Sequence, residues 1–134
     1  MDEESRREGL HAPERERPPR RRVEDLEVFK LAHDLALSVY RASESFEPSA
    51  PSLVNDLRRA AVAVPANLAE GAGRATRAEY QSFVSMAQGT AAVVSYYLLL
   101  AKDLGHLGEA DCQHLREGYG RAGYMLSRFA QSMS

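Results

Sequence analysis

One short junction near residue 70 constrains the fold of this chain more than any other feature. An apolar run with helical spacing contains Pro65 and ends at Gly71 and Gly73, and Thr76 and Glu79 follow at once. Glycine commonly stands just past a helix end, whereas a threonine followed three residues later by a glutamate forms a capping box that starts a helix. The sequence therefore predicts two helices joined by a tight turn. The first of them is expected to be kinked at Pro65, which cannot donate a backbone hydrogen bond.

The same spacing of apolar residues continues on both sides of this junction, and no stretch alternates as a strand would. We expect helices over residues 24–46, 50–71, 76–106 and 109–131. Short connections between successive helices favour an all-α fold, an antiparallel, up-down-up-down four-helix bundle.

The residues expected to face the core repeat at intervals of three and four positions. They are Leu26, Phe29, His33, Ala36, Leu37 and Tyr40 in the first helix; Leu53, Leu57, Ala60, Ala61, Val64 and Leu68 in the second; Tyr80, Phe83, Ala87, Ala91, Val94, Leu98, Ala101 and Leu104 in the third; and Cys112, Leu115, Tyr119, Ala122, Leu126 and Phe129 in the last. His33 is expected to be a hydrogen-bonded core histidine. Ser49 is the expected N-cap of the second helix, with Pro51 in its first turn.

The third helix carries a second apolar stripe beside the one assigned to the core. Met86, Val93, Leu100 and Leu107 repeat at intervals of seven, with Tyr96 beside them. A helix with two apolar faces can bury only one of them inside its own bundle, and the other usually makes a further contact. The sequence therefore predicts self-association through these five residues.

Composition and charge divide the chain into two parts. Residues 1–22 hold seven arginines, six acidic residues and three prolines, and the remainder carries more acidic than basic residues. We expect a disordered arginine-rich tail over 1–22 and a bundle domain over 23–134. With one cysteine, Cys112, the chain can form no internal disulfide. We find neither an apolar signal segment nor a run of about 18 apolar residues, so we expect a cytoplasmic protein without a membrane span.

Catalytic chemistry has no clear signature in this chain. The four histidines are spread over the tail, the first helix, a turn and the last helix. Cys112 lies on an apolar stripe and is expected to be a small buried side chain. Gly71 and Gly73 follow a helix and lack the lysine of a phosphate-binding loop. We therefore expect no enzyme activity, no catalytic residues, no metal ligands and no cofactor.

Two polar residues near the junction admit two interpretations. Glu70 opposes the helix dipole and needs a cation, either Arg74 or an arginine at 58 or 59 of a neighbouring chain. Asn67 could satisfy carbonyl groups freed near Pro65. The simpler interpretation is that both residues organise the helix end. The alternative is that Asn67 and Glu70, with Arg58 and Arg59, form a polar seam between subunits.

Several segments carry a family resemblance in a fixed order. They are Leu26-Glu27-Val28-Phe29-Lys30-Leu31-Ala32, Asp56-Leu57-Arg58-Arg59-Ala60-Ala61, Asn67-Leu68-Ala69-Glu70-Gly71, Glu79-Tyr80-Gln81-Ser82-Phe83 and Ala87-Gln88-Gly89-Thr90. Over residues 24–131 the chain resembles the four-helix-bundle proteins encoded in intervening sequences of 23S ribosomal RNA genes, with Asp56 in place of the usual glutamine. The resemblance implies a homopentamer around a central channel and no enzymatic activity. It also implies kinship with the accessory variability determinant of diversity-generating retroelements, a basic pentamer that binds nucleic acid and a reverse transcriptase.

The functional expectation is a homo-oligomeric adaptor associated with nucleic acid or nucleoprotein. Its partners would be further copies of itself, RNA or DNA, and a nucleic-acid-processing protein. The residues expected to contact phosphate are Arg58, Arg59, Arg74 and Arg77, with Arg20, Arg21 and Arg22 of the tail. The residues expected at the oligomer interface are Met86, Val93, Tyr96, Leu100, Leu107, Asn67 and Glu70. The alternative is an oligomeric scaffold that binds proteins and has no affinity for nucleic acid.

Overall fold

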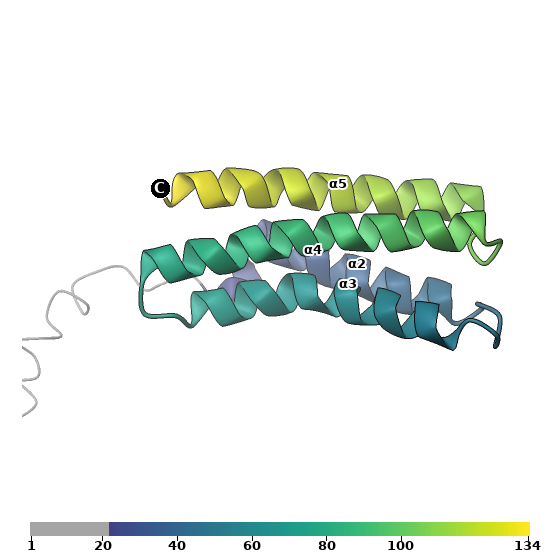
Figure 1. The fold of residues 1–134 in the computed structure, drawn as a ribbon. Coiled ribbons are helices and arrows are strands. Elements are labelled where there is room, and N and C mark those ends of the chain that lie inside the picture. Colours follow the sequence, from purple (N-terminus) through teal and green to yellow (C-terminus); the bar gives the residue numbers. More distant parts are fainter. Residues whose placement is uncertain (1–21) are drawn as a thin grey trace, which may run out of the picture.

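The computed structural model describes residues 22–134, which form a bundle of four long helices (Figure 1). The elements are the 3-10 helix η1 (Val23–Asp25), α2 (Glu27–Ser43), α3 (Pro51–Ala72), α4 (Arg77–Asp103) and α5 (Glu109–Ser132). No strand occurs in this part of the chain, so the expected all-α bundle is confirmed. The tail expected over 1–22 lies outside the described residues, apart from Arg22.

The helices surround one core. Each of α2 and α4 packs against both α3 and α5, whereas the backbones of the diagonal pairs α2–α4 and α3–α5 are farther apart, with no Cα–Cα distance of 8 Å or less. The α2–α3 and α4–α5 connections lie at one end of the bundle, and the α3–α4 turn and the C-terminus lie at the other (Figure 1). At the first of these ends the ring of Phe46 stacks on the ring of His106, with 5.6 Å between their centroids.

Local sequence signals account for most helix ends. The amide of Glu79 donates to the Thr76 hydroxyl at 3.1 Å, and the amide of Thr76 donates to the Glu79 carboxylate at 3.3 Å, which confirms the capping box. Pro51 is the first residue of α3, where no amide donor is needed. The N-cap prediction for Ser49 is wrong, because Ala50 takes this place and no side chain caps the helix.

Glycine has a different role near the end of α3 from the one expected. Gly71 lies inside the helix and is buried, and α3 runs unbroken through Pro65 to Ala72. A Cβ atom added at Gly71 would lie 2.7 Å from the Cβ of Phe83 and 3.0 Å from Cδ1 of Tyr80. The missing side chain therefore allows α3 and α4 to approach closely where the turn joins them.

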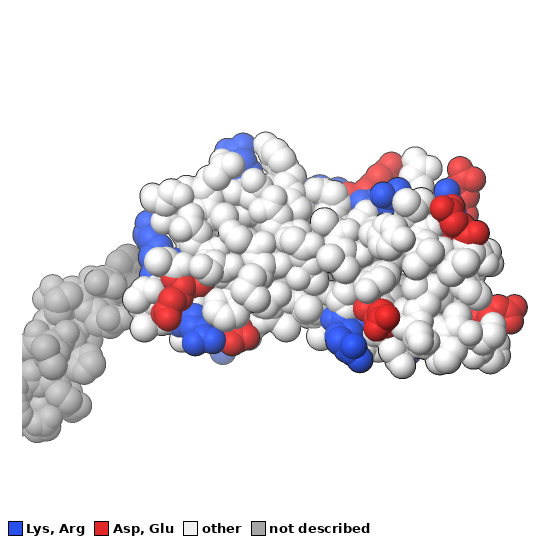
Figure 2. Space-filling view, in the orientation of Figure 1, with Lys and Arg blue, Asp and Glu red and all other residues white. Residues whose placement is uncertain are grey.

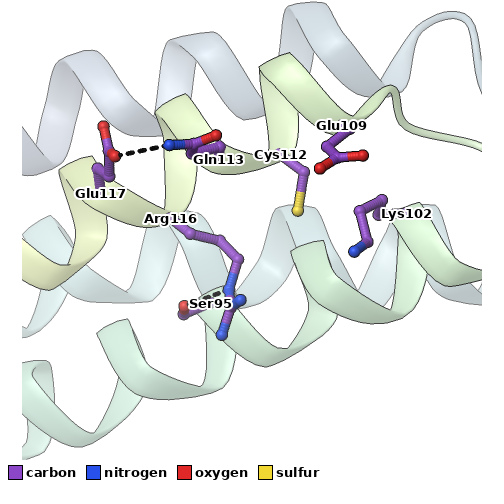
Figure 3. A pocket seen from close by; sticks show the side chains of 7 residues that line it. All are labelled: Ser95, Lys102, Glu109, Cys112, Gln113, Arg116 and Glu117. Atoms are coloured by element: carbon purple, nitrogen blue, oxygen red, sulfur yellow. Dashed lines mark hydrogen bonds between the residues drawn. The ribbon is translucent and has the colours of Figure 1, made fainter.

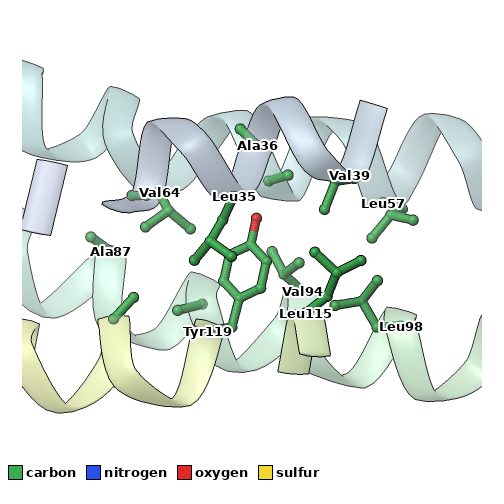
Figure 4. Packing of buried hydrophobic residues seen from close by; sticks show 14 of the residues in the cluster. Leu35, Ala36, Val39, Leu57, Val64, Ala87, Val94, Leu98, Leu115 and Tyr119 are labelled. Atoms are coloured by element: carbon green, nitrogen blue, oxygen red, sulfur yellow. The ribbon is translucent and has the colours of Figure 1, made fainter. Parts of the chain in front are cut away.

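The core stripes predicted for the last three helices are largely confirmed. Tyr119 lies at the centre of the core, with its ring beside Leu35, Val94 and Leu115 (Figure 4). The buried residues of these helices are Leu57, Ala61, Val64 and Leu68 in α3; Val84, Ala87, Ala91, Val94, Leu98 and Ala101 in α4; and Cys112, Leu115, Tyr119, Ala122 and Leu126 in α5. Leu104 is an exception, since 58% of its surface is exposed.

The core stripe predicted for the first helix is wrong in part, because Ala36 is buried and Phe29 packs against the core, but the other predicted residues from His33 onward are exposed. The buried residues of α2 are Val28, Ala32, Leu35, Ala36, Val39 and Ser43. His33 is exposed, and Leu37 and Tyr40 are 39% and 42% exposed. Both stripes have helical spacing, so spacing could not choose between them. Packing decides, because a Cβ at Gly118 would lie only 2.5 Å from Cδ2 of Leu35, which brings this side of α2 closely onto α5.

Leu107 is a second correction, because it lies in the core and not on an outer stripe. Gly105 has a φ of +86° and reverses the chain after α4. The amides of His106 and Leu107 both donate to the carbonyl of Ala101, at 2.9 and 3.3 Å. This turn places the Leu107 side chain in the bundle with only 6% of its surface exposed.

Helix α4 is unusual in its lack of charge. Residues 80–101 contain no aspartate, glutamate, lysine or arginine. In the described part of the chain, α4 alone has the length and composition of a helix that could cross a membrane. This is weak evidence for a membrane span, because the central helix of a soluble bundle meets the same criteria. Its buried stripe faces the core that α3 and α5 share with it.

Candidate functional site: interaction surfaces

The outer surface of α4 is broad, apolar and uncharged. Met86, Val93, Tyr96 and Leu104 are each between 44% and 58% exposed, and Leu100 is half-buried beside them. We call these five residues the α4 face. Figure 2 shows a wide region without charged side chains across the middle of this side of the bundle. Four of the five residues predicted from heptad spacing therefore lie on one surface, and Leu107 does not.

A second apolar surface lies along the seam between α2 and α3. Leu37, Tyr40 and Val62 are between 39% and 44% exposed. Arg58 stacks on Tyr40, and Val62 and Leu37 each lie about one turn from this contact along their own helices. We call these three exposed residues the α2–α3 face. The α2–α3 face was not predicted from the sequence, because the stripe from Phe29 to Tyr40 was expected to lie in the core.

Arg58 is engaged within its own chain. Its Nε donates to the Ser43 hydroxyl at 2.8 Å, and one terminal nitrogen donates to the Tyr40 carbonyl at 3.0 Å. The guanidinium also lies over the Tyr40 ring, 4.6 Å from the centroid. These contacts tie α3 to α2 and occupy Nε and one terminal nitrogen of Arg58.

The other predicted arginines differ in how free they are. Arg74 pairs with Glu70 at 2.7 Å and lies over the Phe83 ring, which confirms the intrachain compensation of Glu70. Arg59 lies 3.8 Å from Asp56, and both side chains are largely exposed, so this pair contributes little. Within residues 22–134, Arg77 makes no ion pair or hydrogen bond and is exposed. Arg22 is also exposed, whereas Arg20 and Arg21 lie outside the described residues.

Asn67 does not have the local role expected of it. The side chain is half-buried in α3, two residues after Pro65, and it makes no hydrogen bond within residues 22–134. It therefore does not satisfy carbonyl groups near Pro65. Asn67 and Glu70 lie within four residues of Gly71, where α3 and α4 approach closely.

Two buried polar atoms lack a partner in the described part of the chain, the Tyr119 hydroxyl and Nδ1 of His106. Burial raises the pKa of Tyr119 well above its ordinary value, because the phenolate would lose its hydration. The Cys112 thiol is buried and donates weakly to the Leu98 carbonyl at 3.5 Å, as a structural cysteine would. Among residues 22–134, no group of three or more histidine, cysteine, aspartate or glutamate side chains is placed to hold a metal ion.

Comparisons with known proteins identify a family by sequence and a similar fold by structure. The model of the 23S rRNA-intervening sequence proteins matches residues 24–128. A crystal structure of a protein of unknown function from the S23 ribosomal protein family of Bacteroides thetaiotaomicron is similar in fold, with a TM-score of 0.71 and 15% sequence identity. That similarity covers 77% of this chain and 97% of the other. No curated protein sequence matches the chain.

Proposed function

The chain belongs to the 23S rRNA-intervening sequence protein family, and from that premise we propose that it is a non-enzymatic, homo-oligomeric bundle acting as a cytoplasmic adaptor for nucleic acid or nucleoprotein. In the proposed assembly, up-down-up-down protomers form a closed ring, which the family resemblance puts at five copies. The observation that carries this proposal is the presence of two separate exposed apolar faces.

Two separate faces favour a ring over a two-fold dimer. The α4 face lies mainly on α4, whereas the α2–α3 face includes α2, the helix diagonally across the bundle. A two-fold dimer buries the same patch on both subunits and would leave the other face in water. If the α4 face of one protomer meets the α2–α3 face of the next, both are buried, and such a head-to-tail contact forms a ring when the rotation between protomers closes.

The arginines support nucleic-acid contact at one end of the bundle. Arg74 and Arg77 lie at the α3–α4 turn, at the same end of the bundle as η1 (Figure 1). Arg77 is unpaired within residues 22–134, and Arg22 is exposed at the base of the tail. Arginine contacts to phosphate predict binding that weakens steeply with salt and shows little sequence preference.

Self-association is tested by breaking each face separately. Met86→Glu with Val93→Glu should give a folded, smaller species in light scattering, and Leu37→Glu with Val62→Glu should do the same. A control with Ser52→Glu and Gln131→Glu, both at exposed polar positions, should keep the wild-type mass.

Mixing the two broken variants identifies the type of interface. Each variant keeps one intact face, so an equimolar mixture should form a heterodimer that neither variant forms alone. If the Leu37→Glu, Val62→Glu variant keeps the wild-type mass, the α2–α3 face is not an interface. A monomeric wild type would refute self-association altogether.

Nucleic-acid binding is tested by titrating a labelled single-stranded RNA and a DNA duplex at about 50 and 200 mM salt. Arg74→Gln with Arg77→Gln should weaken binding and reduce its salt dependence, and substitution of Arg20, Arg21 and Arg22 by glutamine measures the contribution of the tail. Arg41→Gln, an exposed change on α2, serves as the control.

The protein-binding scaffold is the second candidate, and two observations favour it. Arg58 and Arg74 are held by intrachain contacts, and the α4 face carries no charge. Salt-sensitive binding in the titration would support the adaptor. Its absence at low salt, with the oligomer intact, would leave the scaffold as the function.

A further inference from the structure

A groove follows the seam between α4 and α5, on the α5 side of the α4 face. Two openings of about 340 and 440 Å³ share Ser95 and Arg116 and therefore adjoin each other along this seam. Gly120 and Gly123 line it, and a Cβ added at either glycine would meet nothing within 4 Å. The α5 wall is therefore low, and another backbone could approach it closely.

One cation is held in the middle of this groove without a counterion. Nε of Arg116 donates to the Ser95 hydroxyl at 3.0 Å, which directs the side chain from α5 toward α4 (Figure 3). The residues three and four positions away on α5 are Cys112, Gln113, Tyr119 and Gly120, none of them acidic. The facing part of α4 is uncharged, and Arg116 makes no ion pair within residues 22–134. Its terminal nitrogens are thus available to a ligand.

We propose that this groove binds a helix of a partner protein that carries small and apolar side chains around one aspartate or glutamate. The carboxylate pairs with the Arg116 guanidinium, which can donate two parallel hydrogen bonds. The small side chains lie over Gly120 and Gly123, which belong to neither of the two faces that the ring buries. This inference rests on the adaptor proposal and names the chemistry of its protein partner.

The surroundings of Arg116 favour a single carboxylate over a nucleic-acid backbone. Glu109, at the start of α5, and Glu117, next to Arg116, line the same groove together with Lys102 of α4 (Figure 3). A strand of phosphates laid along the groove would pass these two acids and be repelled. A helix with one acidic residue places its carboxylate at Arg116, and its apolar side chains match the uncharged stretch of α4 over residues 80–101, with Lys102 beyond the end of that stretch.

The test uses full-length protein and two synthetic probes. Each is an alanine-rich helical peptide of about 18 residues, or roughly 27 Å. Leucines lie on one face, with a glutamate between them in the first probe and a glutamine in the second. Fluorescence anisotropy should show the glutamate peptide binding about tenfold tighter to the wild type, as expected for charge-assisted hydrogen bonds. Arg116→Gln should abolish this preference. Arg121→Gln, at another exposed arginine of α5 without an ion pair in the described residues, should preserve it.

A second variant tests the shape of the groove. Gly120→Leu places a side chain where the structure has open space, so the protein should fold and lose both peptides. Equal affinities of the two peptides for the wild type, or an equal loss of preference in Arg116→Gln and Arg121→Gln, would overturn the proposal. The proposal would also be overturned if Arg116→Gln weakened the binding of a single-stranded RNA but left the binding of the glutamate peptide unchanged. Light scattering on the same samples measures the mass of the oligomer separately. A loss of peptide binding in the groove can therefore be distinguished from a loss of self-association.

Discussion

Gly71→Ala should destabilise the protein, although the same substitution stabilises most helices. Alanine in place of glycine inside a helix contributes about 1 kcal/mol. At Gly71 the new Cβ would lie 2.7 Å from the Cβ of Phe83, whereas carbon atoms in contact rest at about 3.5–4.0 Å. The helices α3 and α4 must then separate by roughly 1 Å, and overpacking of this kind costs about 1–3 kcal/mol. The expected net loss is about 1 kcal/mol.

Gly123→Ala is the matched control, because Gly123 also lies inside a helix but its added Cβ would meet nothing within 4 Å. This variant should gain up to about 1 kcal/mol. Urea unfolding followed by circular dichroism measures both, at one protein concentration because self-association would add to the apparent stability. If Gly71→Ala stabilises as much as Gly123→Ala, then α3 and α4 do not meet closely at Gly71 and the reasoning is refuted.

Three further predictions concern buried and engaged side chains. Tyr119→Phe should stabilise the protein by about 1 kcal/mol, because it removes a buried hydroxyl without a partner in the described residues. Burial raises the pKa of Tyr119, so the folded wild type keeps a proton that the unfolded chain loses above about pH 10. The wild type therefore loses stability as the pH rises further, and the advantage of the variant in urea unfolding should grow. Leu107→Ala should lower the free energy of unfolding by about 2–4 kcal/mol, as a core residue would, whereas Met86→Ala at an exposed position should change the folding of the isolated protomer little and alter the mass in light scattering. Arg58→Ala should cost about 1–2 kcal/mol through its lost contacts to α2, and Arg59→Ala, whose one ion pair is exposed, should cost less than about 0.5 kcal/mol in the same assay.

The predicted fold was accurate where it depended on groups close together in the chain, as at a helix end, or on a helix with a single candidate core stripe. Thr76 and Glu79 cap α4 because the two groups are close in the chain and need no other helix to form their hydrogen bonds. The core stripes of α3, α4 and α5 followed from spacing. In α4 the heptad residues Met86 and Val93 were also placed correctly outside the core.

The candidate surfaces were harder to predict, because they depend on which groups from different helices meet. The phosphate-contact prediction included Arg58, but Ser43 and Tyr40 of α2 engage its guanidinium across the bundle. The α2–α3 face was missed for a related reason, since exposure of Leu37 follows from how α2 is rotated against its neighbours. Arg116 was not singled out either. Its lack of acidic neighbours three and four residues away was visible in the sequence, but the groove beside it was not.

By itself the sequence determined the number of helices, most of their ends and the inward side of three of them, because these depend on local hydrogen bonds and on the helical repeat. Only the tertiary structure decided the rotation of α2, where two stripes had the same spacing and close packing at Gly118 selected the one with Leu35. It also decided the burial of Leu107, which follows from the left-handed backbone at Gly105 and the carbonyl of Ala101. Rotation about a helix axis changes no hydrogen bond within that helix, so only its neighbours can fix it.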